Sequence, residues 1–168
     1  MRVRNNLSHW LDMMKPMNTS YSMRMPKAAL FPGLLGLIPF YVLALSSFAS
    51  LGLPPVIALL GMVTYGAVIL SFVGAIWWGV AIHAPAGTPR TGLFVWSVVP
   101  ALIGWFATLT APDLGVLMLA AGFLIQWVLD AFLSKKHPTL FPPWVFMLRS
   151  ILTAGVLSAL SLSWWLLV

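Results

Sequence analysis

Residues 65–79 read Tyr-Gly-Ala-Val-Ile-Leu-Ser-Phe-Val-Gly-Ala-Ile-Trp-Trp-Gly, and they lie inside an uncharged apolar run from Pro54 to Ile82. A helix over that run would be about 43 Å long, whereas the hydrocarbon core of a bilayer is about 30 Å thick. The stretch therefore predicts a membrane-spanning helix, and the rest of the chain can be read outward from it.

Small side chains recur along this predicted helix. Ala67, Ser71, Ala75 and Gly79 are spaced four residues apart, and Gly74 lies beside them. Helices in lipid associate where small residues let their backbones approach closely. We therefore predict that these five residues form the face against which other helices pack.

The composition of the whole chain agrees with a membrane protein. Hydrophobic residues make up 61% of it and charged residues 7%, against about 45–50% and about 25% in soluble domains. There are no cysteines, which excludes disulfides, thiolate catalysis and cysteine metal sites.

Five apolar runs, at residues 31–51, 54–82, 91–110, 113–133 and 145–168, are each close to the ~20 residues that a spanning helix needs. Pro39 and Pro100 lie inside the first and third runs and predict kinks there. The fold class predicted for residues 29–168 is an all-α membrane protein, a compact bundle of five transmembrane helices.

Residues 1–28 form a basic tail with several alternative interpretations. Apolar residues at i, i+3, i+4 and i+7 favour a short amphipathic helix on the membrane surface: Leu7, Trp10, Leu11 and Met14. A disordered basic tail is an equal alternative, and the arginine-rich character is compatible with an organelle transit peptide. Several methionines in the tail also allow a translation start further downstream.

Every lysine and arginine falls on one side of a five-span topology. Five lie in the tail, one is Arg90 between the second and third runs, and the others are Lys135, Lys136 and Arg149 around the fourth connection. Basic residues in short loops favour the cytoplasmic side. We predict the N-terminus inside and the C-terminus outside, so the net charge of +6 reflects topology and no nucleic-acid partner is expected.

Tryptophans gather near the predicted span ends, at Trp77, Trp78, Trp96, Trp105, Trp164 and Trp165. Tryptophan is enriched at membrane–water interfaces. We predict that these residues form an aromatic belt and do not stack on a ligand.

The candidate polar site combines Gln126, Asp130 and Arg149. Gln126 and Asp130 are one helical turn apart. Arg149 lies about one turn inside the start of the next run, at a depth similar to that of Asp130. Ionisable residues within a membrane are functional candidates by default. Two interpretations remain: a structural ion pair that clamps the fourth and fifth helices, or a site for a proton or a polar headgroup.

Two weaker candidates are Tyr65, near the middle of the second run, and His83 at its inner end. An interhelical hydrogen bond is the simpler role for Tyr65. No ligand spacing typical of a metal site occurs, and the chain has no glutamate, so neither metal nor cofactor is expected. Nucleotide-binding and Ser/His/Asp motifs are also absent from the sequence.

Residues 65–79, 124–130 (Leu-Ile-Gln-Trp-Val-Leu-Asp), 143–153 (Pro-Trp-Val-Phe-Met-Leu-Arg-Ser-Ile-Leu-Thr) and 33–39 carry a family resemblance. They are similar to the bacterial and mitochondrial domain-of-unknown-function family that includes human transmembrane protein 69. The likeness covers about residues 30–160, and Trp77 departs from it where a polar or basic residue is expected. If the family uses that position chemically, this chain would lack the group.

The resemblance implies a multi-span protein of a bacterial inner membrane, or alternatively of a mitochondrial inner membrane. It does not imply that the protein is an enzyme. Short loops and small-residue faces favour a non-enzymatic accessory or assembly subunit of a larger membrane complex, surrounded by membrane lipids. The alternative is a small transporter or lipid-handling protein that uses Gln126, Asp130 and Arg149.

Overall fold

The computed structural model describes residues 25–46, 52–88 and 90–167, and it has no strand within these residues. Its helices are α2 (Lys27–Leu35), α3 (Ile38–Leu45), α4 (Pro55–His83), α5 (Arg90–Thr108), α6 (Pro112–Lys136) and α7 (Pro143–Leu167). Helices α2 and α3 together make the first of five segments that are long and apolar enough to cross a membrane. The predicted all-α, five-helix membrane fold is confirmed.

The helix bounds differ from the predicted spans mainly at the polar ends. The first span begins at Lys27, four residues before the predicted start, and α6 continues to Lys136 beyond the predicted end at residue 133. Helical hydrogen bonding continues past the last apolar residue because long lysine side chains can extend toward water. The predicted amphipathic helix of the tail and the predicted end of the first span at residue 51 lie outside the described residues.

The first span is broken before Pro39, at Gly36 and Leu37, and not at the proline itself. A proline has no N–H and its ring clashes with the carbonyl four residues earlier. That residue is Leu35, where α2 ends. Pro39 then lies in the first turn of α3, where its missing N–H would have no partner in any case.

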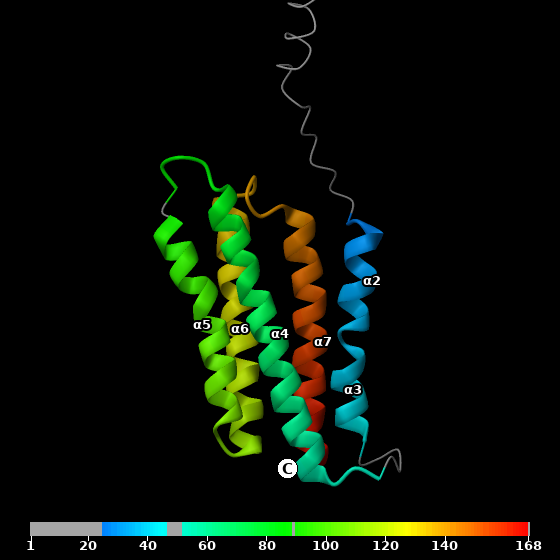
Figure 1. Ribbon diagram of the computed structural model, residues 1–168. Helices are drawn as coiled ribbons and strands as arrows, with labels where there is room; N and C mark the ends of the chain where they lie inside the picture. The colour runs from blue at the N-terminus through cyan, green and yellow to red at the C-terminus, as the bar shows by residue number, and fades with distance from the viewer. Residues whose placement is uncertain (1–24, 47–51, 89, 168) are drawn as a thin grey trace, which may run out of the picture.

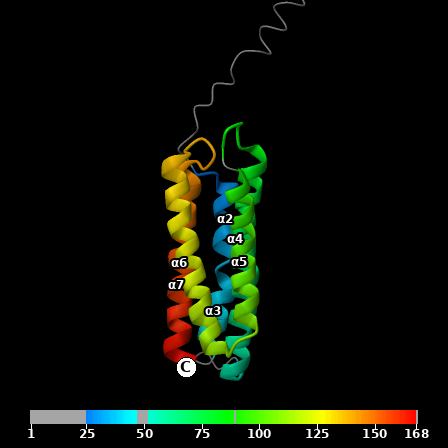
Figure 2. The same cartoon turned by 90° about the vertical axis from the view of Figure 1, so that its left-hand side faces the viewer.

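Helix α4 is the centre of the bundle. It packs against α3, α5, α6 and α7, and Figure 1 shows it crossing between α5 on one side and the α2–α3 span on the other. In Figure 2, α6 and α7 form one side of the bundle. The buried core includes large side chains from several helices, among them Phe40, Met62, Leu70, Leu119 and Leu160.

The packing face of α4 differs from the predicted one. Ala67 and Gly74 are buried, Ser71 is half-buried, but Ala75 and Gly79 are exposed. Four-residue steps drift by about 40° each around a helix with about 3.6 residues per turn. The buried residues instead recur in steps of one, three and four, which keeps them on one face: Ala58, Leu59, Met62, Val63, Gly66, Ala67, Leu70, Gly74, Trp77 and Ala81. The predicted face is therefore wrong for Ala75 and Gly79 within this chain.

Two glycines allow α4 and α5 to approach closely. A Cβ atom added to Gly104 would lie 3.0 Å from both the Cα and the carbonyl oxygen of Ala67, and one added to Gly74 would lie 2.7 Å from Pro100. Pro100 is buried within α5, which continues through it from Arg90 to Thr108. Small residues thus bring these two backbones together, as expected in a lipid environment.

The described basic residues outside the helix interiors gather at one end of the bundle. Lys27 begins α2, Arg90 begins α5, and Lys135 and Lys136 end α6. Figure 1 shows these helix ends at the top and the end of α7 at the bottom. The Arg90 guanidinium donates to the carbonyl of Ala84, the residue that follows α4.

Candidate functional site

The strongest candidate site is an ion pair between α6 and α7. Arg149 donates from Nε and Nη2 to Oδ2 of Asp130, at 2.8 and 2.6 Å. Asp130 is fully buried and Arg149 is 6% exposed. The short connection at residues 137–142 makes the two helices antiparallel neighbours, which brings residues on opposite sides of the loop to a similar depth.

Three further side chains complete the network around this pair. Gln126 Nε2 donates to Oδ1 of Asp130 at 2.9 Å, one helical turn away on α6. The indole N–H of Trp77 on α4 donates to the same oxygen at 2.7 Å. Trp96 on α5 donates to Oε1 of Gln126 at 3.0 Å. The site therefore joins α4, α6 and α7 at one buried carboxylate and reaches α5 through Gln126.

The network satisfies both oxygens of the Asp130 carboxylate. Each Asp130 oxygen accepts two hydrogen bonds, and no buried side-chain nitrogen or oxygen among the described residues lacks a partner. The charges of Asp130 and Arg149 balance. Buried polar networks are costly when partly satisfied and rigid when fully satisfied, so this arrangement favours a clamp over an open proton or solute site.

The tryptophans were the part of the site that sequence reasoning missed. Trp77 is buried and Trp96 half-buried, and both donate hydrogen bonds to the polar network. Trp78, Trp105, Trp164 and Trp165 are exposed on the bundle surface. Trp77 could have been found because it continues the buried α4 stripe, three residues after Gly74. Its departure from the expected polar residue is partly compensated, since its indole N–H supplies a donor to Asp130.

The ion pair lies deeper in the bundle than predicted. Asp130 precedes the end of α6 by six residues and Arg149 follows the start of α7 by six residues, which is about 9 Å along each helix. A second contact ties the same helices, because Trp127 Nε1 donates to Ser150 Oγ at 2.9 Å. The hairpin of α6 and α7 is thus cross-linked by two polar contacts in its basic half.

Tyr65 does not join the polar network but serves the break in the first span. Its hydroxyl donates to the carbonyl oxygen of Gly36 at 2.9 Å, and its ring packs edge-on against Phe40 with centroids 4.9 Å apart. The hydroxyl thereby satisfies a backbone acceptor at the helix break, which is the interhelical role expected for Tyr65.

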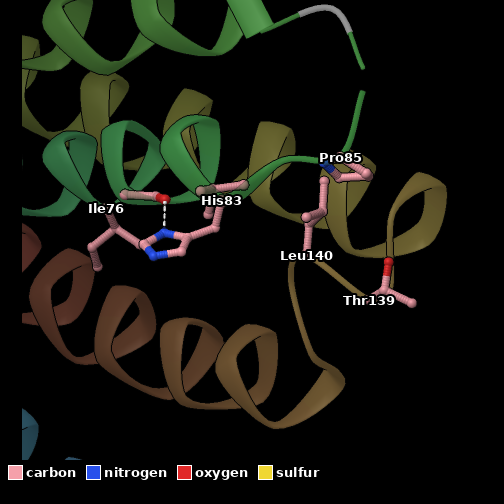
Figure 3. A pocket seen from close by; sticks show the side chains of 7 residues that line it. Ile76, His83, Pro85, Thr139 and Leu140 are labelled. Carbon is pink, nitrogen blue, oxygen red and sulfur yellow. Dashed lines mark hydrogen bonds between the residues drawn. The ribbon is translucent and has the colours of Figure 1, made fainter. Parts of the chain in front are cut away.

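His83 also lies apart from Asp130. Its Nδ1 is 2.9 Å from the carbonyl oxygen of Gly79, which can only accept, so Nδ1 carries the proton in this contact. Figure 3 shows the ring beside Ile76 and turned away from Pro85 and Leu140 in the same hollow. No cluster of three His, Asp or Glu residues that could hold a metal occurs in the described part of the chain.

Comparison with known proteins identifies the family. The family model described as "Protein of unknown function (DUF3429)" matches residues 25–165. This chain belongs to that family. The match covers the described membrane domain of this DUF3429 member except residues 166–167, and it confirms the resemblance noted in the sequence.

Two curated relatives of this DUF3429 protein are both called transmembrane protein 69. The one from Xenopus tropicalis is 38% identical over 132 residues, 76% of this chain and 50% of the relative. The one from Mus musculus is 32% identical over 127 residues, 73% of this chain and 51% of the relative. The chain thus spans about half the length of these relatives. No solved structure matches it.

Proposed function

We propose that this DUF3429 protein is a non-enzymatic accessory or assembly subunit that packs against a larger membrane complex. We place it in a bacterial inner membrane, with a mitochondrial inner membrane as the alternative. The observation that carries the proposal is the polar network around the Asp130 carboxylate. Asp130, Gln126 and Arg149 bind one another and two tryptophans, so the chain's strongest candidate for chemistry is used to hold its own helices together.

The connections between helices also support a role within the plane of the membrane. Only residues 109–111 separate α5 from α6, and residues 137–142 separate α6 from α7. Such loops are too short to build a separate aqueous site. A partner would therefore meet the chain mainly through its lateral helix faces, which carry exposed aromatic side chains such as Phe72 and Trp165.

Co-purification tests the proposal directly. The chain should be tagged at its own chromosomal locus, extracted in a mild detergent, and measured by native gel and quantitative mass spectrometry. We expect a larger particle in which one membrane protein is present in fixed ratio to this chain. A second, unrelated five-span protein with the same tag and expression level provides the background.

Reciprocal purification through the candidate partner separates a subunit from a contaminant. If the proposal is correct, tagging the partner recovers this chain in the same ratio. A particle that contains only this chain and lipid, at its natural level and in several mild detergents, would overturn the proposal.

A further inference from the structure

Two hollows lie along the same side of α4. The first is an apolar cavity of about 530 Å³ between the α2–α3 span, α4 and α7, with Phe123 of α6 at its wall. The second is an open depression of about 740 Å³ near the basic end of the bundle, lined by the end of α4 and by Pro85, Thr139 and Leu140. Ile76 lines both, so the two hollows adjoin.

One face of α4 runs through the pair of hollows. Its lining residues recur in steps of three and one, which corresponds to a single helical stripe: Ile69, Phe72, Val73, Ile76, Gly79, Val80 and His83. We call this region the α4 groove. It extends from the middle of the bundle to the basic end, and Phe72, which lines the apolar cavity, is 67% exposed.

The inner part of the groove is almost wholly apolar but contains one charged side chain. Arg149 lines the cavity, and its Nε and Nη2 are taken by Asp130. Its third nitrogen, Nη1, donates to no described residue. Because Arg149 lines the cavity, Nη1 is the nitrogen that remains for an occupant.

A second polar group accompanies Arg149 on the same wall. Thr153 is one turn further along α7, is half-buried and lines the cavity. The hydroxyl of Thr153 has no hydrogen bond to any other described side chain or backbone group. An occupant of the cavity would therefore meet two polar groups on one side and hydrocarbon on the others.

The outer part of the groove lies at the end of the bundle where four described basic side chains gather, although none of the four lines either hollow. Lys27, Arg90, Lys135 and Lys136 lie at this end of the bundle, whereas Asp113 begins α6 at the other end and Asp130 is neutralised by Arg149. The described part of this end thus has no acidic side chain that is free to balance them. A negatively charged group is the complementary occupant.

We propose that the α4 groove is a binding site for one membrane phospholipid. An acyl chain occupies the apolar cavity, ester oxygens accept hydrogen bonds from Arg149 and Thr153, and the phosphate lies toward His83 and the basic end. The apolar cavity alone, at about 530 Å³, lies within the range of about 300–1,000 Å³ found for small-molecule sites. This proposal goes beyond the accessory role and does not depend on it.

Phospholipid retention by the purified full-length chain provides the first test. The chain is extracted from membranes, washed extensively in detergent, and its bound lipid is measured by mass spectrometry. Val73→Phe fills the groove from α4, while Val68→Phe places the same ring on the exposed face of that helix. We expect the wild type and Val68→Phe to retain a phospholipid and Val73→Phe to lose it.

The polar contact is tested with Thr153→Val, which keeps the side-chain shape and leaves the Asp130 network intact. We expect faster exchange of a labelled phospholipid from this variant than from the wild type. Diacylglycerol and free fatty acid serve as competitors, because the first lacks the phosphate and the second lacks the glycerol. Both should compete less well than the phospholipid.

Several outcomes would overturn the proposal. One is equal retention by Val73→Phe and Val68→Phe when melting temperatures show that both variants are folded. An unchanged rate of lipid exchange in Thr153→Val would contradict the proposed hydrogen bond from Thr153. Equal competition by diacylglycerol and phospholipid would contradict recognition of the phosphate. All of these measurements use the isolated chain, so their failure leaves the co-purification result for the accessory role unaffected.

Discussion

Four helices meet around Asp130, three of them at its carboxylate and α5 through Gln126. It accepts hydrogen bonds from Trp77 on α4, Gln126 on its own helix and Arg149 on α7, while Gln126 in turn accepts one from Trp96 on α5. Because the site is buried in a membrane domain, each of these groups would otherwise lack a hydrogen-bonding partner. The network therefore specifies how the helices are placed relative to one another.

Removing either charge of the pair should destabilise the protein. Asp130→Asn leaves the Arg149 guanidinium buried opposite a neutral amide, and Arg149→Gln leaves the carboxylate without its counter-ion. Breaking a buried ion pair typically costs about 3–5 kcal/mol. We expect each variant to lower the melting temperature in detergent clearly.

Two controls distinguish the loss of the ion pair from a general loss of charge. One is the double variant at Asp130 and Arg149, and the other is substitution of a different acid, Asp113. Asp130→Asn with Arg149→Gln should recover much of the stability, since no uncompensated charge remains. Asp113→Asn, at the exposed start of α6, should change stability by no more than about 1 kcal/mol. A double variant as unstable as the sum of the single variants would argue against a structural clamp.

Two glycines of α5 should respond oppositely to the same substitution. Gly104→Ala places a methyl group against the backbone of Ala67, and overpacking of this kind costs about 1–3 kcal/mol. Gly92 has nothing within 4 Å of an added Cβ, so Gly92→Ala should stabilise its helix by up to about 1 kcal/mol. Thermal unfolding of the two variants checks this, and similar melting temperatures would contradict the close approach.

The sequence predicted three residues of the polar network, Gln126, Asp130 and Arg149, but not the two tryptophans that contact them. The i, i+4 spacing of Gln126 and Asp130 and the short loop before Arg149 were sufficient to bring those three together. Trp77 and Trp96 could not be assigned in the same way, because an indole near a helix end fits an interfacial belt equally well. Their role depends on helix rotations, which spacing alone does not give.

Among the elements, the first span shows how a break in a helix is accommodated. Helix α2 ends four residues before Pro39, and the carbonyl oxygen of Gly36 accepts a hydrogen bond from the Tyr65 hydroxyl. The sequence predicted a kink from Pro39 but placed it at the proline itself, whereas the steric conflict acts on the preceding turn. Similarly, a strict four-residue repeat predicted the packing face of α4 and drifted onto its exposed side at Ala75 and Gly79.

Tyr65→Phe tests the contact between the break and α4. The substitution keeps the ring against Phe40 but leaves the Gly36 carbonyl without its side-chain donor, which should cost about 1–3 kcal/mol. Thr64→Val changes a neighbouring exposed hydroxyl and should have little effect. Equal melting temperatures for the two variants would show that the hydrogen bond does not stabilise the span.

For the whole molecule, the arrangement of five spans places the start of α2 and the end of α7 at opposite ends of the bundle (Figure 1). The segregation of basic residues predicts that the α2 end is cytoplasmic. Reporter fusions at Thr88, at Asp113 and after Val168 should read inside, outside and outside. A cytoplasmic reading after Val168 would contradict this orientation.

The division of the ion pair between α6 and α7 has a consequence for biosynthesis. The ribosome completes α6, with its acid, before it completes α7, with the matching base. Inserting an aspartate alone costs about 2.5–3.5 kcal/mol at the centre of a helix on translocon scales, and less at Asp130, which lies six residues from the end of α6. We expect α6 to remain near the translocon until α7 arrives, so that the two helices enter the bilayer as one hairpin and the last two spans mature together.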